Sequence, residues 1–225
     1  VVLATNYMRR WDNKYKYVEK IIREKKLGKL QTIVAYGATS LLTSACHLVD
    51  LLIYFGGEFE WCVGDLQQDY VRIVDGVEDP GAIAMIKFKN GGHCFLKATS
   101  KNDKNFMFEI DVMCDSGRLN IKESWDNNDL SDLCIHEFLP RNSDKTGRYM
   151  TLKQKQYKDS VISNERMIYA VGDIINCIES IYKIEPASSG LNAIGVHEII
   201  EGIKHSSIKN NRFQLVVHAT NGIPS

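Results

Sequence analysis

The chain has 225 residues, of which 44% are hydrophobic and 25% are charged, and it contains only 4 prolines. This composition is typical of one globular domain with a sizeable core, and it excludes a disordered chain. Lys plus Arg and Asp plus Glu are equal at 28 each, so the overall charge does not favour nucleic acid or an anionic membrane surface as a partner. A neutral small molecule or another protein fits better.

The 6 cysteines are widely spaced and include no Cys-x-x-Cys pair. This spacing argues against a zinc site and against a secreted disulfide scaffold. Free buried thiols in a reducing cytoplasm are the simpler interpretation. No stretch approaches the ~18 apolar residues that a membrane-spanning helix needs, and the N-terminus lacks the apolar run of a signal peptide. We therefore expect a cytoplasmic chain with no metal and no membrane partner.

The first elements alternate between strand and helix patterns. VVLAT, at 1–5, is typical of a strand that continues from something longer. A helix is expected from residue 13, ending near Gly28, and a strand over 30–37. The apolar positions of that helix are Tyr15, Val18, Ile21 and Ile22. A second, strongly apolar helix is expected from about Thr43 to Phe55, ended by the glycine pair that follows.

From residue 59 the hydrophobic period changes to two, which predicts a series of strands joined by turns. The expected strands are 59–74, 81–89, 93–100, 106–114, 118–124, 133–139 and 149–157, and the first expected turn is EDPG. Short turns favour antiparallel neighbours. One face of 106–114 carries Phe106, Phe108, Ile110 and Val112, so the sheet is predicted to have one apolar face and one mixed face.

Two further helices follow the strands, and a last strand is expected over 212–217. The stripe of the first helix is Met167, Ala170, Val171, Ile174, Ile178 and Ile181. The second helix is expected to be capped by Ser188 or Ser189, with the stripe Leu191, Ile194, Ile199 and Ile203. With the helix that holds His47, both can cover the apolar face. The predicted fold class is therefore α+β, a large, mostly antiparallel, open-faced sheet with helices on one face. Its other face is a candidate subunit interface.

His47 and Asp50 lie three residues apart within the apolar run SLLTSACHLVDLLIYFGG. On a helix, this spacing places both on one face, one turn apart. Imidazole exchanges a proton near neutral pH, so His47 is a candidate general acid or base, although a hydrogen-bonded core histidine is the alternative. Asp50 is more simply an orienting or capping carboxylate, because a buried carboxylate must be paired.

NYMRRW, at 6–11, places several polar side chains at a strand-to-helix transition, where they can meet a hydroxylated substrate or form a solvated basic turn. Lys97 and Lys101 are most simply surface lysines near a strand end. The other histidines show no ligand spacing. The sequence contains no glycine-rich phosphate loop, no His-Glu-x-x-His, no Gly-x-Ser-x-Gly and no EF-hand loop, so it offers no motif for a nucleotide, protease, hydrolase or calcium site.

Five stretches in sequence resemble the C-terminal domain of the glucose-fructose oxidoreductase, inositol dehydrogenase and rhizopine-catabolism (Gfo/Idh/MocA) family. They are NYMRRWDNKYKYVEKIIREKKLGKLQTIVAYG, SACHLVDLLIYFGG, GAIAMIKFKNGG, DVMCDSGRLNI and SSGLNAIGVHEIIEGIKHSS. The similarity spans nearly the whole chain. It implies a two-domain NAD(P)-dependent enzyme that acts on a sugar, cyclitol or related polyol. Its Rossmann domain, which holds NAD or NADP, would precede this chain.

The resemblance also implies roles for parts of this chain. Residues 1–12 would end the linker or strand from the missing Rossmann domain, and 13–225 would form the substrate-binding and oligomerisation domain of a homodimer or homotetramer that associates through the open sheet face. His47 would assist proton transfer at the substrate oxygen. The substrate-binding candidates are Asn6, Arg10, Thr43 and Lys97. No cofactor is expected to bind this chain alone, which should not turn over substrate.

Thr43 departs from the family pattern, because many members have Asp four residues before the histidine. A threonine hydroxyl can hydrogen-bond a sugar but cannot act as a carboxylate base. The departure keeps a second hypothesis open: a non-catalytic ligand-binding or assembly module with the same fold.

Overall fold

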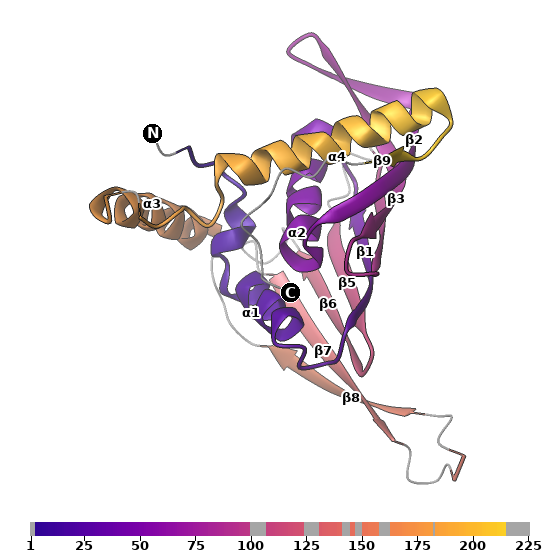
Figure 1. The fold of residues 1–225 in the computed structure, drawn as a ribbon, viewed down its shortest axis with the longest axis vertical. Helices are drawn as coiled ribbons and strands as arrows, with labels where there is room; N and C mark the ends of the chain where they lie inside the picture. Colours follow the sequence, from indigo (N-terminus) through magenta and orange to yellow (C-terminus); the bar gives the residue numbers. More distant parts are fainter. Residues whose placement is uncertain are drawn as a thin grey trace.

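The computed structural model describes residues 3–99, 107–123, 131–140, 145–146, 150–157, 163–181 and 183–214. In this part of the chain, a 9-stranded sheet carries helices on one face (Figure 1). The predicted α+β architecture is therefore confirmed.

The helical segments alternate in part with the strands. They are η1 (Met8–Trp11), α1 (Asn13–Arg23), η2 (Leu41–Ala45), α2 (Cys46–Gly56), α3 (Ser163–Glu179) and α4 (Gly190–Lys209). The strands are β1 (Leu30–Gly37), β2 (Phe59–Val74), β3 (Val77–Phe88), β4 (His93–Ala98), β5 (Phe108–Cys114), β6 (Gly117–Glu123), β7 (Ser131–Pro140), β8 (Met150–Tyr157) and β9 (Phe213–Gln214).

The strand order across the sheet is β8-β7-β6-β5-β1-β4-β3-β2-β9. Among these strands, β1 and β4 pair in parallel, and the other pairings are antiparallel. Side chains alternate between the two faces as the pleat requires. In β4, Cys94 and Leu96 are buried under the helices, whereas Phe95 and Lys97 lie on the open face.

The core lies between the sheet and the layer formed by α1, α2 and α4, with α2 at its centre (Figure 1). Leu48, Leu51 and Leu52 of α2 are fully buried. A helix surrounded by protein on nearly all sides must be apolar on nearly all sides. The long apolar run around His47 therefore reflects the position of α2 in the core.

Three boundaries differ from the prediction. The helix α1 ends at Arg23 and not near Gly28, because Lys25 adopts a left-handed φ of 52° that stops the helix. The helical run begins at Leu41, because η2 is a π-helical turn that continues directly into α2. The expected turn at EDPG is wrong, because those residues lie within β3. The hairpin turns at Asp75 and Gly76, whose φ angles are 50° and 79°. Asp-Gly with two positive φ values matches the twist of a tight hairpin, which explains why the turn forms there.

The expected role of α3 is also wrong, because α3 does not cover the sheet and instead extends away from it (Figure 1). Its predicted stripe is largely exposed: Met167, Val171, Ile178 and Ile181 retain 42%, 54%, 53% and 77% of their surface. Of the predicted stripe, Ala170 is buried, and the buried side of α3 also carries Arg166 and Cys177. The reason is that α3 packs on η1 through polar contacts that hydrophobic periodicity does not report.

The helix α4 follows the prediction only in its second half. Ile199 and Ile203 are buried, whereas Leu191 and Ile194 are 40% and 48% exposed. Ser189 caps α4 through a capping box with Asn192, as one of the two alternatives predicted. The last strand, expected over 212–217, is β9, which pairs with β2. Residues 215–217 lie outside the described part of the chain, as do Val1, Val2 and Phe106.

Each of the 6 cysteines is free, as predicted, but Cys46 and Cys134 are only partly buried. Among the helices described here, none combines the length and hydrophobicity needed to cross a membrane.

Candidate functional site

His47 is the second residue of α2, directly after the π-helical turn η2. Its ring meets the ring of Tyr7 edge to face, with 5.6 Å between centroids and an interplanar angle of 89°. Tyr7 is 8% exposed and comes from the segment that leads into η1. The structure therefore brings together the predicted catalytic residue and a member of the NYMRRW stretch.

The two ring nitrogens of His47 have different surroundings. Nδ1 is sealed from solvent and has no hydrogen-bond partner. In the described residues, Nδ1 and Arg10 Nη2 are the sealed side-chain polar atoms without such a partner. Nε2 makes no side-chain hydrogen bond within this set either, and it is not among the sealed atoms, so part of its surface reaches solvent. Nε2 is thus the nitrogen through which the half-buried ring can contact a ligand.

Burial and, to a smaller extent, the charge of Arg9 together lower the pKa of His47 to about 4, although Glu123 opposes both effects. The imidazole is therefore neutral at pH 7. Burial also raises the pKa of the Tyr7 phenol, with smaller contributions from Cys46 and Asp50. Both groups that meet at this position are uncharged near neutral pH.

A buried charged cluster lies behind His47. Arg9 Nε donates to Glu123 Oε1 at 3.0 Å, and the Tyr15 hydroxyl donates to the same oxygen at 2.9 Å. Arg166 joins Glu123 to Asp12, with distances of 3.1 Å and 2.6 Å from its Nη2. Burial by itself raises the pKa of Glu123, but Arg9 and Arg166 outweigh it and hold that pKa below its usual range. The cluster connects η1, β6 and α3.

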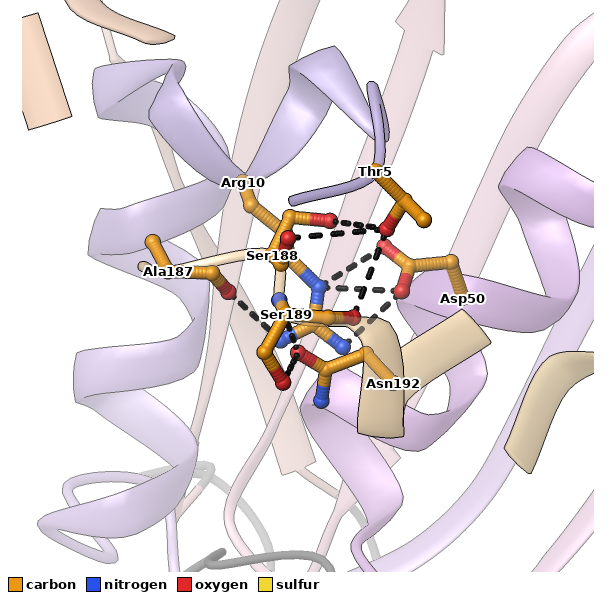
Figure 2. Close-up of polar contacts among 7 residues, drawn as sticks. All are labelled: Thr5, Arg10, Asp50, Ala187, Ser188, Ser189 and Asn192. Atoms are coloured by element: carbon orange, nitrogen blue, oxygen red, sulfur yellow. Dashed lines mark hydrogen bonds and ion pairs between the residues drawn. The ribbon is translucent and has the colours of Figure 1, made fainter. Parts of the chain in front are cut away.

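Arg10 forms a separate buried pair with Asp50 (Figure 2). Its Nε lies 2.9 Å from both carboxylate oxygens, and its Nη1 donates to the carbonyl oxygen of Ala187 at 3.2 Å. Nη2 is 2.9 Å from Asp50 Oδ1, too poorly aligned to form a hydrogen bond. Beside this pair, the Thr5 hydroxyl lies 3.1 Å from the Ser188 hydroxyl and donates to the Ser189 carbonyl oxygen at 3.4 Å (Figure 2). The N-terminal segment is thereby fixed against α2 and the start of α4.

This pairing assigns Arg10 a structural contact. Its guanidinium is 6% exposed and bound to Asp50, so it has little capacity left for a substrate. Asp50 itself supports the helix, as the sequence suggested, because removing either partner leaves the other charge buried and uncompensated. We therefore leave Arg10 out of the proposed site.

Thr43 donates its hydroxyl to Asp79 Oδ2 at 2.7 Å. Asp79 is 1% exposed and also accepts from the Ser40 hydroxyl and from the backbone N–H groups of Leu42 and Thr43. It thus caps the helical turn that precedes His47 from a different strand, β3. A carboxylate does stand beside position 43, but it is engaged by four donors.

Asn6 and Lys97 lie in different places. Asn6 is exposed, and its Nδ2 contacts Met167 Sδ at 3.5 Å near α3. Lys97 projects from the open face of β4, opposite the helix layer that contains His47. The structure therefore does not bring Lys97 together with His47.

Sequence reasoning missed Asp79 and Glu123, because each lies in a strand far along the chain from the residues that it contacts.

A dinucleotide cofactor needs backbone N–H groups free to bind phosphate at a helix N-terminus. After β1, the N–H groups of Leu42 and Thr43 already bind the Asp79 carboxylate, whose negative charge repels phosphate. At the start of α4, the Ser189 hydroxyl and the Asn192 side chain form a capping box. The described helix starts after β1 and before α4 therefore do not fit the phosphates of NAD or NADP.

The comparisons with known proteins agree with this architecture. No protein-family model matches the chain. A putative NADPH-dependent oxidoreductase from Desulfitobacterium hafniense is 13% identical, with a TM-score of 0.76 over 95% of this chain and 65% of that one. The WlbA dehydrogenase from Bordetella pertussis, solved with NADH and UDP-GlcNAcA, is 15% identical, with a TM-score of 0.68 over 97% and 64%.

A levoglucosan dehydrogenase, solved with NADH and levoglucosan, is 16% identical, with a TM-score of 0.71 over 96% of this chain and 66% of that one. This chain has the fold of these oxidoreductases. The resemblance to Gfo/Idh/MocA enzymes is thus confirmed at the level of the fold. The chain spans about two thirds of the length of these solved structures.

An uncharacterized protein from Haemophilus influenzae is 27% identical over 107 residues, which cover 47% of this chain and 99% of that protein.

Proposed function

We propose that this chain is the substrate-binding part of a longer NAD(P)-dependent oxidoreductase that acts on a sugar, a cyclitol or a related polyol. The supporting observation is His47, held at the first turn of α2 with one nitrogen sealed and the other open to solvent. Residues 1–12 would lead from a dinucleotide-binding domain, and residues 13–225 would form the substrate domain. The 6 free thiols suit a cytoplasmic protein.

In this proposal, the cofactor exchanges a hydride with the substrate carbon and is bound by residues outside this chain. His47 contacts the substrate oxygen on that carbon. Tyr7 and the π-helical turn form the adjoining surface, and the Asp79 cap holds that turn in place. Asn6 remains a candidate substrate-binding residue, because its side chain is exposed.

We test this function with the full-length gene product, measuring NADH and NADPH oxidation against a panel of carbonyl sugars, and NAD or NADP reduction with levoglucosan. We expect turnover that His47→Ala lowers by about 100-fold or more, the usual contribution of a positioned acid, base or donor. His197→Ala is the matched control, because His197 is exposed on α4. Turnover that His47→Ala leaves unchanged would remove His47 from the reaction.

A second candidate is a non-catalytic ligand-binding or assembly module. The observation that favours it is Thr43, whose hydroxyl is engaged by Asp79 and which supplies no carboxylate of its own. A full-length product that binds neither NADH nor NADPH would support this candidate over the enzyme.

The open sheet face is the proposed surface for assembly into a homodimer or homotetramer. Ile83 and Phe95 are 60% and 46% exposed there, on adjacent strands. Met113 is 37% exposed on the same face, next to the ion pair between Arg118 and Asp111. Apolar side chains bordered by charge pairs are typical of a self-complementary interface.

A further inference from the structure

The inference concerns which ring nitrogen of His47 carries the proton, and it rests on the proposed function for its catalytic meaning. A neutral imidazole has one N–H donor and one bare nitrogen that accepts. A proton on Nδ1 would place a donor in a sealed position with no acceptor, which is unfavourable because the buried N–H would lose its hydrogen bond to water. A proton on Nε2 places the donor where solvent or substrate can pair with it.

We propose that His47 faces the substrate as a neutral imidazole protonated at Nε2, and that it serves as a hydrogen-bond donor to the substrate oxygen. The sealed Nδ1 sets this tautomer. A bare Nε2, which a general base requires, would force the proton onto Nδ1. The surroundings of the ring therefore favour polarising a substrate carbonyl over removing a proton from a substrate hydroxyl.

The charged and titratable groups that act on the ring support this assignment. Arg9 of η1 disfavours a second proton, and Glu123 of β6, which opposes this effect, is neutralised by Arg9 and Arg166. Tyr7 lies against the ring, and its phenol stays protonated. Cys46, the neighbour in α2, also stays protonated, because burial raises its pKa to about 11.

The Tyr7 hydroxyl is a second neutral group, on a ring that packs against the ring of His47. It has no hydrogen-bond partner among the described residues and is not sealed, although Tyr7 as a whole is 8% exposed. Two uncharged hydrogen-bonding groups on side chains whose rings are in contact suit the oxygens of a polyol or sugar better than an anionic group, which a cation would recognise more strongly.

The deciding experiment is histidine ¹⁵N–¹H long-range NMR on the chain itself, which needs no ligand and no cofactor. The protein has 6 histidines, and the signal that disappears in His47→Gln identifies His47. We expect the Nε2–H tautomer at pH 7 and no imidazolium at pH 6. A proton on Nδ1, or an imidazolium at pH 6, would overturn the proposal, whatever the activity of the full-length product.

Kinetics of the full-length product give the second readout. Gln places an amide donor near the position of Nε2, and Asn places one near the position of Nδ1. We expect His47→Gln to keep carbonyl-sugar reduction within about 10-fold of the wild type, and His47→Asn and His47→Ala to fall by about 100-fold. Equal losses in all three, with native circular dichroism, would show that a donor near the position of Nε2 does not restore the contribution of His47, and would overturn the proposal. A product without turnover would count against the proposed function, and the NMR result would still decide the tautomer.

Discussion

At the scale of single residues, the site depends on polar atoms whose surroundings differ within one side chain. His47 is sealed at Nδ1 and open at Nε2, and Asp79 accepts hydrogen bonds from four donors around one helical turn. Arg10 is likewise almost fully used by Asp50 and Ala187. A residue type alone therefore does not define its role, because its free atoms decide what it can bind.

The lowered pKa of His47 predicts a pH dependence of stability. Its folded-state pKa is about 4, below the ordinary value of 6.5, so the unfolded chain binds more protons between these values. The contribution of the neutral His47 to folding stability is therefore fully present above pH 6.5 and is lost as the pH falls from 6.5 through 4. The loss between pH 7 and pH 4 is about 3 kcal/mol.

Urea unfolding at pH 7, 5.5 and 4 measures this contribution when the wild type is compared with His47→Gln. Buried carboxylates such as Glu123 titrate in both proteins, so the difference isolates His47. We expect the wild type to lose free energy of unfolding relative to His47→Gln as the pH falls. A difference that stays constant with pH would contradict the prediction.

At the scale of elements, α2 and α3 show opposite relations to their surroundings. α2 is enclosed by the sheet and by α1 and α4, and its end lies so close to β3 that a Cβ built on Gly56 comes within 2.0 Å of the Phe88 ring. α3 extends from the molecule, and a Cβ built on Gly172 meets nothing within 4 Å. Packing therefore requires a glycine at position 56 in α2, whereas it does not require one at position 172 in α3.

Alanine at these two glycines should change stability in opposite directions. Gly56→Ala forces the buried Phe88 ring to move, which costs about 1–3 kcal/mol. Gly172→Ala gains about 0.5–1 kcal/mol, because alanine favours a helix interior more than glycine does. Thermal unfolding of both variants checks this, and a stabilised Gly56→Ala would show that the contact with Phe88 is not tight.

At the scale of the whole molecule, the sheet has one face under the helices and one open face. The open face holds Ile83, Phe95 and Met113 in the middle of the sheet, where single chains rarely leave a contiguous apolar area. Such an area is removed from water when two copies pack face to face.

Charge in this area should abolish the proposed assembly. We expect the wild type to be a dimer or tetramer by light scattering after size exclusion, and Phe95→Glu to be a folded monomer, because association would bury an unpaired charge. Ile178→Glu is the control, since Ile178 is also exposed but lies on α3, away from this face. A monomeric wild type would contradict the proposed interface.

The sequence by itself determined most elements of the fold, because hydrophobic periodicity reports locally which side of a helix or strand is buried. It placed α1, β1, α2 and most strands near their observed bounds, and it singled out His47 and Asp50. Periodicity misjudged α3, whose apolar stripe is exposed, because polar contacts with η1 hold that helix away from the sheet.

Only the tertiary structure decided which polar atoms pair and which remain open. Thr43 and Asp79 lie 36 residues apart, and Arg9 and Glu123 lie 114 residues apart. No local pattern encodes such pairs, because they form when strands and helices distant in the chain pack together. The same packing sealed one nitrogen of His47 and separated Lys97 from it by the thickness of the sheet.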